Sequence, residues 1–477
     1  MLFNSLTFLI FLGVVLAFYY RLPFKAQNWF LLAASYVFYG WWDVRFLGLL
    51  LFTSFFDYGC ALWIENQPDR VKRKWLLGFS MALNLGVLCV FKYFNFFADT
   101  LALALGSLGV QASLPTLQVI LPVGISFYTF LSMSYTIDVY RGELKATRDP
   151  VAFLLFVAFF PHLVAGPIVR ASDLVPQCAA PRTVKRDEVI NGLWLILLGY
   201  VKKVVIADRL AKVAAHSFAL DGSVPFTDAN AWLGLYAFAF QIYGDFSGYS
   251  DIARGLSKLM GFELPVNFRA PYLVTNPPEF WKHWHITLST WLRDYLYIPL
   301  GGNRKGPART YANLTITMLL GGLWHGAGIA YLIWGAYHGL LLVVHRLWTS
   351  WRGGVSSEGA RPHLVLRMLL VIFFFHVTCI GWLFFRAGAL PGGVQFASIA
   401  RHFELLGVFP LTHGVSGLAL PVLLLGALAL VLQWKAEAMS RFCEWRLDWQ
   451  ALAVAGALAA IAALGLFENA QFIYFQF

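Results

Sequence analysis

Four histidines stand next to or inside apolar stretches of the chain, where an ionisable side chain is unusual. They are His283, His285, His325 and His338, and all fall between residues 279 and 338. An ionisable group at membrane depth is costly, so the default interpretation of such a group is a functional site. A neutral imidazole, whose ordinary pKa is near 6.5, can remove a proton from a hydroxyl group at cytoplasmic pH. Alternatively, some of these histidines only cap helices or satisfy a neighbour in a packed bundle.

His285 and its neighbours predict one polar face on a helix that would begin near Pro277. Trp281 lies four residues before His285 and Ser289 four residues after it, so an aromatic ring, an imidazole and a hydroxyl would share that face. His283 would lie about 200° away around the same helix and point elsewhere. A His-x-His pair could also bind a metal, but no acidic residue or cysteine stands at ligand spacing nearby, so we predict no metal site.

His325 is flanked by glycines in the sequence GGLWHGAG, which lets other backbone or a thin substrate approach its imidazole closely. If residues 311–346 form one straight helix, His338 lies about 20 Å further along the axis and about 220° around it. The two imidazoles could not then act as a pair. A second catalytic imidazole would have to come from another helix, and His285 has the most suitable surroundings.

A basic connection precedes the His325 segment. Residues 299–310, PLGGNRKGPART, combine turn-forming glycines with Arg304, Lys305 and Arg309. Such a loop could hold the phosphates of an acyl carrier at the cytoplasmic face. The alternative is a basic loop that only follows the positive-inside bias of membrane proteins.

A second polar run, GDFSGYSDIAR at residues 244–254, lies within an otherwise apolar segment. Asp251 and Arg254 are three residues apart, a spacing that predicts a buried, structural ion pair on one helix face. The serines do not stand in a G-x-S-x-G elbow, so a serine nucleophile is a weak hypothesis.

The composition is that of a membrane protein. Of the 477 residues, 59% are hydrophobic and only 13% are charged, with a mean hydropathy of +0.65. The net charge of +11 does not indicate nucleic-acid binding, because the basic residues lie in short connections and form no continuous stripe. The five cysteines have no paired spacing and suggest neither a disulfide framework nor a zinc site.

Apolar runs predict an all-α polytopic bundle with about 11 or 12 membrane segments, because a spanning helix needs about 20 apolar residues. The first run, Leu2 to Tyr20, lacks the basic start and cleavage site of a signal peptide and is expected to be a retained helix. The predicted segments run near residues 3–20, 28–56, 75–105, 117–140, 151–168, 190–212, 230–260, 279–298, 311–346, 364–386, 416–434 and 450–468.

We expect one membrane-embedded domain over residues 1–477, with small polar surface elements only near 350–363 and 388–415. Glycine and proline interrupt the apolar runs, and they predict breaks or re-entrant segments where the backbone lines a cavity or is buried in protein. These interruptions lie at residues 121–127, 162–170 and 296–303.

Five segments, in the same order, resemble the membrane-bound O-acyltransferases, and specifically their bacterial branch that includes the membrane subunit of alginate O-acetylation. They are LPVGISFYTFLSMSYTIDVYRG (121–142), PHLVAGPIVR (161–170), GDFSGYSDIARG (244–255), EFWKHWHITLSTWLRDYLYIPLGGNR (279–304) and LWHGAGIAYLIWGAYHG (323–339). FIYFQF at residues 472–477 also fits that branch. The resemblance implies a helical bundle around a central tunnel, with His325 as the catalytic residue and His285 as its supporting partner. It also implies an acyl-thioester donor from the cytoplasm and an acceptor from the other side.

Together these features predict an acyltransferase that moves an acetyl group from acetyl-CoA, with no bound cofactor, across the bacterial inner membrane to an exported polysaccharide such as alginate. Transfer would be direct or through a periplasmic partner acetyltransferase or polysaccharide assembly proteins. Trp281, Ser289, Arg304 and Lys305 would contact the donor. The same chemistry could serve cellulose, peptidoglycan or teichoic acid. A transporter with a buried histidine proton relay is the alternative class, and the lack of internal repeats and the wide histidine spacing disfavour it.

Overall fold

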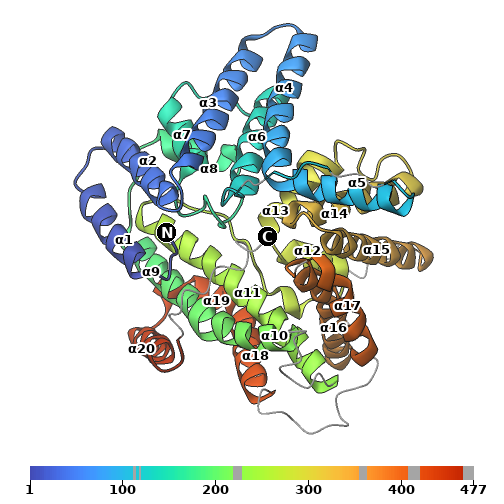
Figure 1. Cartoon of the computed structure of the whole chain (residues 1–477). Coiled ribbons are helices and arrows are strands. Elements are labelled where there is room, and N and C mark those ends of the chain that lie inside the picture. The colour runs from blue at the N-terminus through green and yellow to red at the C-terminus, as the bar shows by residue number, and fades with distance from the viewer. Residues whose placement is uncertain are drawn as a thin grey trace. The chain divides into compact units, whose positions relative to one another are not determined.

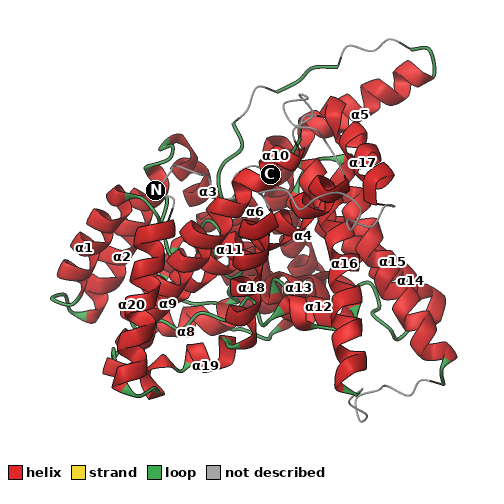
Figure 2. Cartoon of the chain, turned by 90° about the horizontal axis from the view of Figure 1, so that it is seen from below, coloured by secondary structure: helices red, strands yellow, loops and turns green. Residues whose placement is uncertain are grey.

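The computed structural model of the chain describes residues 1–110, 114–117, 120–218, 228–353, 363–390, 392–406 and 419–465. Every regular element within these ranges is a helix, so the all-α prediction is confirmed (Figure 2). The predicted polar elements at 350–363 and 388–415 lie partly outside the described residues, and residues 472–477 lie wholly outside them.

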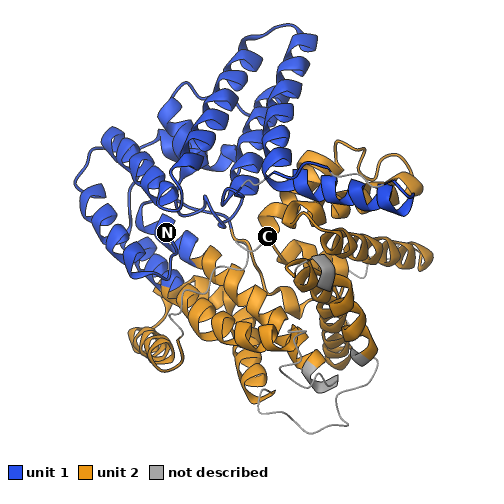
Figure 3. Ribbon diagram, viewed as in Figure 1, with its two compact units in different colours: residues 1–196, 252–265 blue, residues 197–251, 266–477 orange. Residues whose placement is uncertain are grey.

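The chain divides into two compact units (Figure 3). The first comprises Met1–Ile196 and Ile252–Pro265, and the second comprises Leu197–Asp251 and Val266–Phe477. The division falls inside helices α9 (Arg186–Tyr200) and α11 (Asp228–Leu259). The single membrane domain that the sequence predicts over residues 1–477 stays a prediction.

The first unit contains the helices of the N-terminal part of the chain (Figure 1). They are α1 (Leu6–Tyr19), α2 (Phe24–Gly40), α3 (Arg45–Asn66), α4 (Arg70–Leu88), the π-helix η1 (Cys89–Tyr93), α5 (Phe94–Ser107), α6 (Ile125–Arg141), α7 (Pro150–Ala158), α8 (Ala171–Ala179) and the start of α9.

The predicted breaks near residues 121–127 and 162–170 are both present in the first unit. α6 begins after Gly124, whose φ of 76° is in the left-handed region that glycine adopts readily. A side chain at this position would come within 2.8 Å of the carbonyl oxygen of Leu163, in the turn that separates α7 from α8. The two breaks therefore pack on each other, and glycine permits the close approach.

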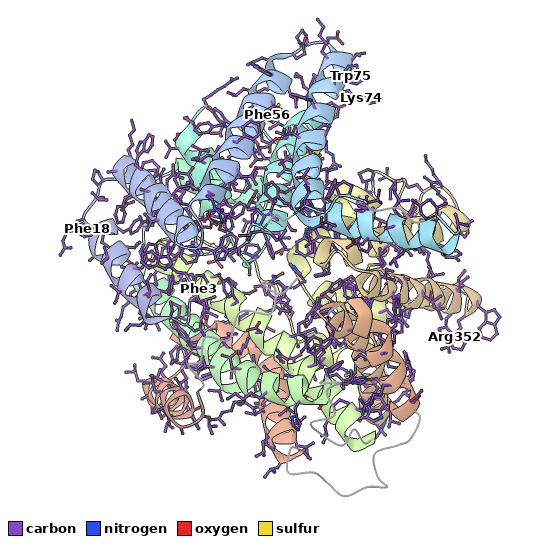
Figure 4. The ribbon with its side chains drawn as sticks, viewed as in Figure 1. Phe3, Phe18, Phe56, Lys74, Trp75 and Arg352 are labelled. Carbon is purple, nitrogen blue, oxygen red and sulfur yellow. The ribbon has the colours of Figure 1, made fainter. Side chains whose placement is uncertain are left out.

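Two of the basic connections lie at the same end of the first unit. Arg73 at the start of α4 donates a hydrogen bond to the carbonyl oxygen of Tyr140 at the end of α6 (2.8 Å). Arg148, which follows α6, forms an ion pair with Glu65 at the end of α3 (2.7 Å). Figure 4 shows the neighbouring side chain of Lys74 at the outer end of α4. Basic residues at one end of the helices are what the positive-inside rule predicts.

The second unit holds the elements that carry the candidate catalytic histidines. They are the π-helix η2 (Val201–Ala207), α10 (Asp208–Phe218), most of α11, η3 (Pro271–Leu273), α12 (Pro277–His283), α13 (Ile286–Leu292), the π-helix η4 (Arg293–Tyr297), α14 (Pro307–His325), α15 (Ile329–Trp351), α16 (Leu364–Gly388), α17 (Gly392–Leu406), α18 (Ala419–Trp434), α19 (Ala436–Ser440), η5 (Phe442–Glu444) and α20 (Leu447–Leu464).

Five of the described helical stretches are long and apolar enough to cross a membrane, which confirms the membrane architecture. They are α3, Arg70–Ser107, Arg186–Phe218, α16 and α20, and α1 and α18 are shorter apolar helices. The higher predicted number of segments, the re-entrant segments and the central tunnel stay predictions.

The sequence analysis predicts two long single helices that the structure does not contain, so these two predictions are wrong. The 279–298 segment is α12, α13 and η4, because the helix breaks at Trp284 and His285 and a new one starts at Ile286. The 311–346 segment is two helices, because the chain turns at residues 326–328 between α14 and α15. The expected break near 296–303 is present between η4 and α14.

α14 and α15 pack closely along glycines. A methyl group on Gly322 of α14 would overlap the carbonyl oxygen of Tyr331 of α15. A methyl group on Gly335 of α15 would overlap the carbonyl oxygen of Met318 of α14. Small residues allow membrane helices to approach at backbone distance and gain packing along their length. The antiparallel hairpin therefore holds the turn that follows His325 in a fixed position.

A buried ion network joins η2 to α11 in the second unit. The Nζ of Lys203 lies 2.6 Å from Asp245 and 2.9 Å from Asp208, and the Nζ of Lys202 lies 2.6 Å from Asp251. Asp251 therefore does form an ion pair, and Lys202 is a partner that the sequence analysis did not assign. Pairing of this kind is how charge is usually accommodated inside a membrane bundle.

Candidate active site

His285 occupies a strained position in the break between α12 and α13. Its φ of 42° and ψ of 55° are left-handed, and Ala270 is the other non-glycine residue with positive φ in the described part of the chain. Residues held in sparsely populated backbone regions are concentrated at active sites and ligand clamps. The side chain is 0% exposed, so the turn places an imidazole fully inside the unit.

Asn267 fixes the orientation of this imidazole. The side-chain oxygen of Asn267 accepts hydrogen bonds from the backbone N–H of Thr287 (3.2 Å), from the Thr287 hydroxyl (3.0 Å) and from Nδ1 of His285 (3.2 Å). A backbone N–H can only donate, so the Asn267 atom that meets it is the oxygen, and Nδ1 of His285 must carry a proton. In the neutral ring Nε2 is then the basic nitrogen. Nε2 is buried and meets no hydrogen-bonding group in the described residues.

His325 is the last residue of α14 and lies beside His285. The centroids of the two imidazole rings are 6.5 Å apart. That separation is too large for a direct hydrogen bond between the rings and small enough for one hydroxyl group to bind between them. The sequence analysis expected His285, rather than His338, to be the partner of His325, and that role stays a prediction. The straight helix that was expected to separate His325 from His338 does not exist.

Aromatic rings surround the His325 imidazole. Trp324, Trp334 and Phe385 have their ring centroids 5.0, 5.0 and 5.1 Å from that of His325, all close to perpendicular. Trp334 also contacts His338, with 4.9 Å between centroids, so this indole joins the two histidines of the hairpin. Edge-to-face packing of rigid rings restricts the imidazole to a narrow range of orientations.

An apolar cavity of about 220 Å³ ends at His325. It follows one face of α14 from His325 to Leu314, a length of about 16 Å at 1.5 Å per residue. Its polar lining comes mainly from Ser289, Arg293 and Thr317. The lining consists of Trp281, Leu288, Ser289, Leu292, Arg293, Tyr297, Leu314, Thr317, Met318, Gly321, His325, Trp334 and Leu342. An apolar cavity with an imidazole in its lining suits a weakly polar substrate.

Of the four residues that the sequence predicts to contact the acyl donor, two lie in the cavity lining with His325 and two lie elsewhere. Trp281 and Ser289 both line the cavity with His325, although the continuous helical face that suggested them is absent. Arg304 and Lys305 are exposed in the loop before α14. They lie near the opposite end of α14 from His325, and that helix is about 27 Å long from Pro307 to His325.

Asn267, Trp334 and Phe385 were missed by the sequence analysis. Asn267 stands in a Pro-containing connection, and its role depends on tertiary pairing with a turn that no local pattern indicates. Trp334 and Phe385 are aromatic residues in apolar runs, where an aromatic residue is far more often part of the core. The glycines around His325 were the available signal, since they predicted the close packing that these rings provide.

These side chains place two buried imidazoles near each other in a helical membrane protein, one of them in the lining of an apolar cavity. Comparison with known sequences identifies the family. Residues 31–385 match the MBOAT, membrane-bound O-acyltransferase family. The chain therefore belongs to this family, and the prediction that it is an O-acyltransferase is confirmed.

Named relatives share most of the chain's length. The chain is 47% identical over 390 residues to the probable alginate O-acetylase AlgI of Pseudomonas putida. This match covers 81% of the chain and 77% of the relative. It is 36% identical over 418 residues to the peptidoglycan O-acetyltransferase of Helicobacter pylori, and this match covers 81% of the chain and 76% of the relative. It is 27% identical over 276 residues to the teichoic acid D-alanyltransferase of Bacillus subtilis, and this match covers 55% of the chain and 68% of the relative.

Proposed function

We propose that this protein transfers an acetyl group from acetyl-CoA to a hydroxyl group of an exported polysaccharide. His325 is the general base and His285 is its partner. The observation that carries the proposal is the position of His325, whose imidazole both ends the apolar cavity and lies 6.5 Å from that of His285.

The reaction needs one proton to be moved twice. The His325 imidazole removes the proton of the acceptor hydroxyl as its oxygen attacks the thioester carbonyl carbon. The carbon–sulfur bond breaks, the ester forms, and the imidazolium returns the proton to the departing thiolate of CoA. The unprotonated Nε2 of His285 accepts a hydrogen bond from a neighbouring hydroxyl of the acceptor and so orients it, because the reacting hydroxyl gives its single proton to His325 and Nδ1 of His285 is already engaged by Asn267.

The direction of the cavity supports a donor that arrives from the basic end of the hairpin. The cavity runs from His325 toward the end of α14 that carries Arg304 and Lys305. α15 ends at the same side, and Arg352, at its outer end, is shown in Figure 4. The slender arm that carries the thioester occupies the cavity beside Trp281 and Ser289. The phosphates of CoA are held by the basic residues, which suit phosphate oxygens.

The relatives support the choice of acyl group and acceptor. The relative that is 47% identical is named an alginate O-acetylase and the one at 36% a peptidoglycan O-acetyltransferase, and both names specify acetyl transfer to a glycan. The teichoic acid D-alanyltransferase is less similar and matches a smaller part of the chain. An alginate-type polysaccharide is therefore the acceptor we favour, reached directly or through a periplasmic partner acetyltransferase. The protein would lie in a bacterial inner membrane, with the basic loops in the cytoplasm.

The test uses the full chain in lipid nanodiscs with radiolabelled acetyl-CoA. The wild-type protein is expected to release CoA and to move the label to an added glycan. His325→Ala should lower the rate by about 10² or more, the contribution that a general base usually makes. His283→Ala is the matched control, because that imidazole bonds to the carbonyl oxygen of Glu279 in its own helix and is not part of the cavity lining. Equal activity of wild type and His325→Ala, with both folded, would refute the role of His325.

A further inference from the structure

The acyl transfer proposed at His325 creates a negative charge that neither histidine stabilises. As the hydroxyl oxygen bonds to the carbonyl carbon, the electron pair of the C=O bond moves onto the thioester oxygen. Hydrogen-bond donors aimed at that oxygen usually make the largest single contribution to the rate of such a reaction. His325 accepts the proton of the hydroxyl, and His285 has its one N–H engaged by Asn267. The donor to the thioester oxygen must therefore be another group at the His325 end of the cavity.

Most polar side chains of the cavity lining cannot serve as this donor. The hydroxyl groups of Ser289 and Thr317 each donate to a backbone carbonyl oxygen, at 3.2 and 2.7 Å. The Arg293 side chain is ion-paired and 59% exposed, so it extends away from the buried end of the cavity. Tyr297 is the last residue of η4, next to the loop that leads into the start of α14, whereas His325 ends that helix.

Trp334 carries a hydrogen-bond donor that the described part of the chain leaves without an acceptor. Its side chain is 1% exposed, and its indole N–H meets no hydrogen-bonding group there. An indole nitrogen can only donate, and a buried donor without an acceptor is costly enough that it calls for an explanation. The same indole lines the cavity and packs edge to face on His325, with 5.0 Å between the ring centroids.

Trp281 is the other indole in the cavity lining, and its N–H likewise has no acceptor among the described residues. Its ring packs on Trp334 at 5.7 Å and, within the same described residues, makes no ring contact with His325. The carbonyl carbon must lie about 3–3.5 Å from the attacking oxygen, which in turn must lie within hydrogen-bond distance of His325. The thioester is therefore confined to the neighbourhood of His325, and this favours Trp334 over Trp281 as the donor.

We propose that the indole N–H of Trp334 donates a hydrogen bond to the carbonyl oxygen of the thioester and stabilises the negative charge that develops there. This inference rests on the proposed acyl transfer at His325. The carbonyl electron pair moves onto this oxygen as the C–O bond forms. When the pair returns, the C–S bond breaks and the thiolate takes the proton from His325. Trp334 keeps its own proton throughout. Its hydrogen bond is stronger to the anion than to the neutral carbonyl, so it lowers the barrier without tightening the binding of substrate.

The test removes the N–H group and keeps the ring. The full chain is prepared in nanodiscs with benzothienylalanine at position 334, in which a sulfur atom replaces the indole N–H. With radiolabelled acetyl-CoA and an alginate oligosaccharide, we expect kcat to fall about 10²-fold and KM for acetyl-CoA to stay nearly unchanged. Trp334→Phe also lacks the N–H and should show the same loss of kcat. Trp382→Phe is the matched control, because Trp382 is 1% exposed and packs on Trp334 at 6.4 Å but is not part of the cavity lining.

A second measurement separates hydrogen bonding from packing. Acetonyldethio-CoA, a ketone with a methylene group in place of the thioester sulfur, keeps the carbonyl oxygen and cannot release CoA. A hydrogen bond lowers the infrared stretching frequency of its isotope-labelled carbonyl. The carbonyl band should therefore lie at lower frequency in the wild-type protein than in the protein with benzothienylalanine at position 334.

The outcomes distinguish this inference from the proposed function. Loss of both kcat and the band shift at position 334, with Trp382→Phe like the wild type, supports the inference. An unchanged kcat with benzothienylalanine, or a lower kcat with the band still shifted, overturns it. An equal loss of kcat in Trp382→Phe would assign the effect to packing and would overturn it as well. If the wild-type protein releases CoA at a rate that does not depend on His325, the proposed function fails, and the inference fails with it.

Discussion

The imidazoles of His285 and His325 lie 6.5 Å apart although they come from different helices, and Asn267 binds the first of them by its Nδ1. The left-handed backbone of His285 directs its side chain toward the end of α14. Aromatic rings from α15 and α16 hold the His325 imidazole in place. The arrangement is thus preorganised: the order of the site comes from backbone strain and packing before any substrate binds.

Replacing Asn267 with Ala should lower kcat more than it changes KM, because Asn267 acts through His285 and does not touch substrate. We expect a loss of about 10-fold to 100-fold, less than the 10²–10⁴ that a general base itself contributes. Asn267→Asp keeps an acceptor for Nδ1 and should retain more activity and shift the pH profile. Thr287→Val is the control, because it removes one hydroxyl from the cluster and leaves the Nδ1 bond intact. The kinetics of acetyl transfer measure each effect, and an unchanged kcat in Asn267→Ala would show that this orientation is not needed.

Gly321 offers a direct test of what the cavity holds. It lines the cavity one turn before His325, and a methyl group there would meet only the end of the Leu292 side chain, at 3.2 Å. Gly321→Val should therefore fold but fill part of the cavity, raising KM for acetyl-CoA with a smaller effect on kcat at saturation. Gly321→Ala should give a weaker effect of the same kind. Thermal unfolding in nanodiscs checks that both variants are intact, and a KM equal to that of wild type would exclude the cavity as the donor site.

The sequence was sufficient to predict the helical membrane class, which rests on hydropathy. Its motifs also singled out His285 and His325, whose imidazoles lie 6.5 Å apart. It failed where the structure depends on a single backbone conformation. Nothing in helical periodicity indicates that His285 adopts a left-handed φ, so residues 279–298 were predicted to be one helix. The Asn267 contact arises from tertiary packing, which residue type and spacing do not encode.

The close packing of α14 on α15 should be sensitive to a single methyl group. Gly322→Ala and Gly335→Ala each place a methyl on a carbonyl oxygen of the facing helix, and backbone cannot move aside as a side chain can. We expect each to destabilise the protein by about 1–3 kcal/mol, the usual cost of overpacking, and to lower activity by displacing His325. Gly328→Ala is the control, because its φ of −166° suits any residue and its nearest neighbour would be 3.5 Å away. Thermal unfolding in nanodiscs should show lower midpoints for the first two variants only; a similar shift in all three would mean that close helix approach is not the cause.

Charge reversal in the loop before α14 should separate donor binding from chemistry. If Arg304 and Lys305 hold the phosphates of acetyl-CoA, the double variant Arg304→Glu, Lys305→Glu should raise KM for acetyl-CoA and leave kcat nearly unchanged, because His325 is about 27 Å away along α14. The effect should shrink as salt rises, since exposed charges are screened beyond about 10 Å at 0.1 M ionic strength.

Arg441→Glu, at an exposed arginine elsewhere in the same unit, is the control for the double variant and should leave KM for acetyl-CoA unchanged. Steady-state kinetics at two salt concentrations measure these changes. If the double variant has the KM for acetyl-CoA of the wild-type protein, the loop does not bind the donor. Its basic residues then only set the orientation of the protein in the membrane, as the positive-inside rule predicts.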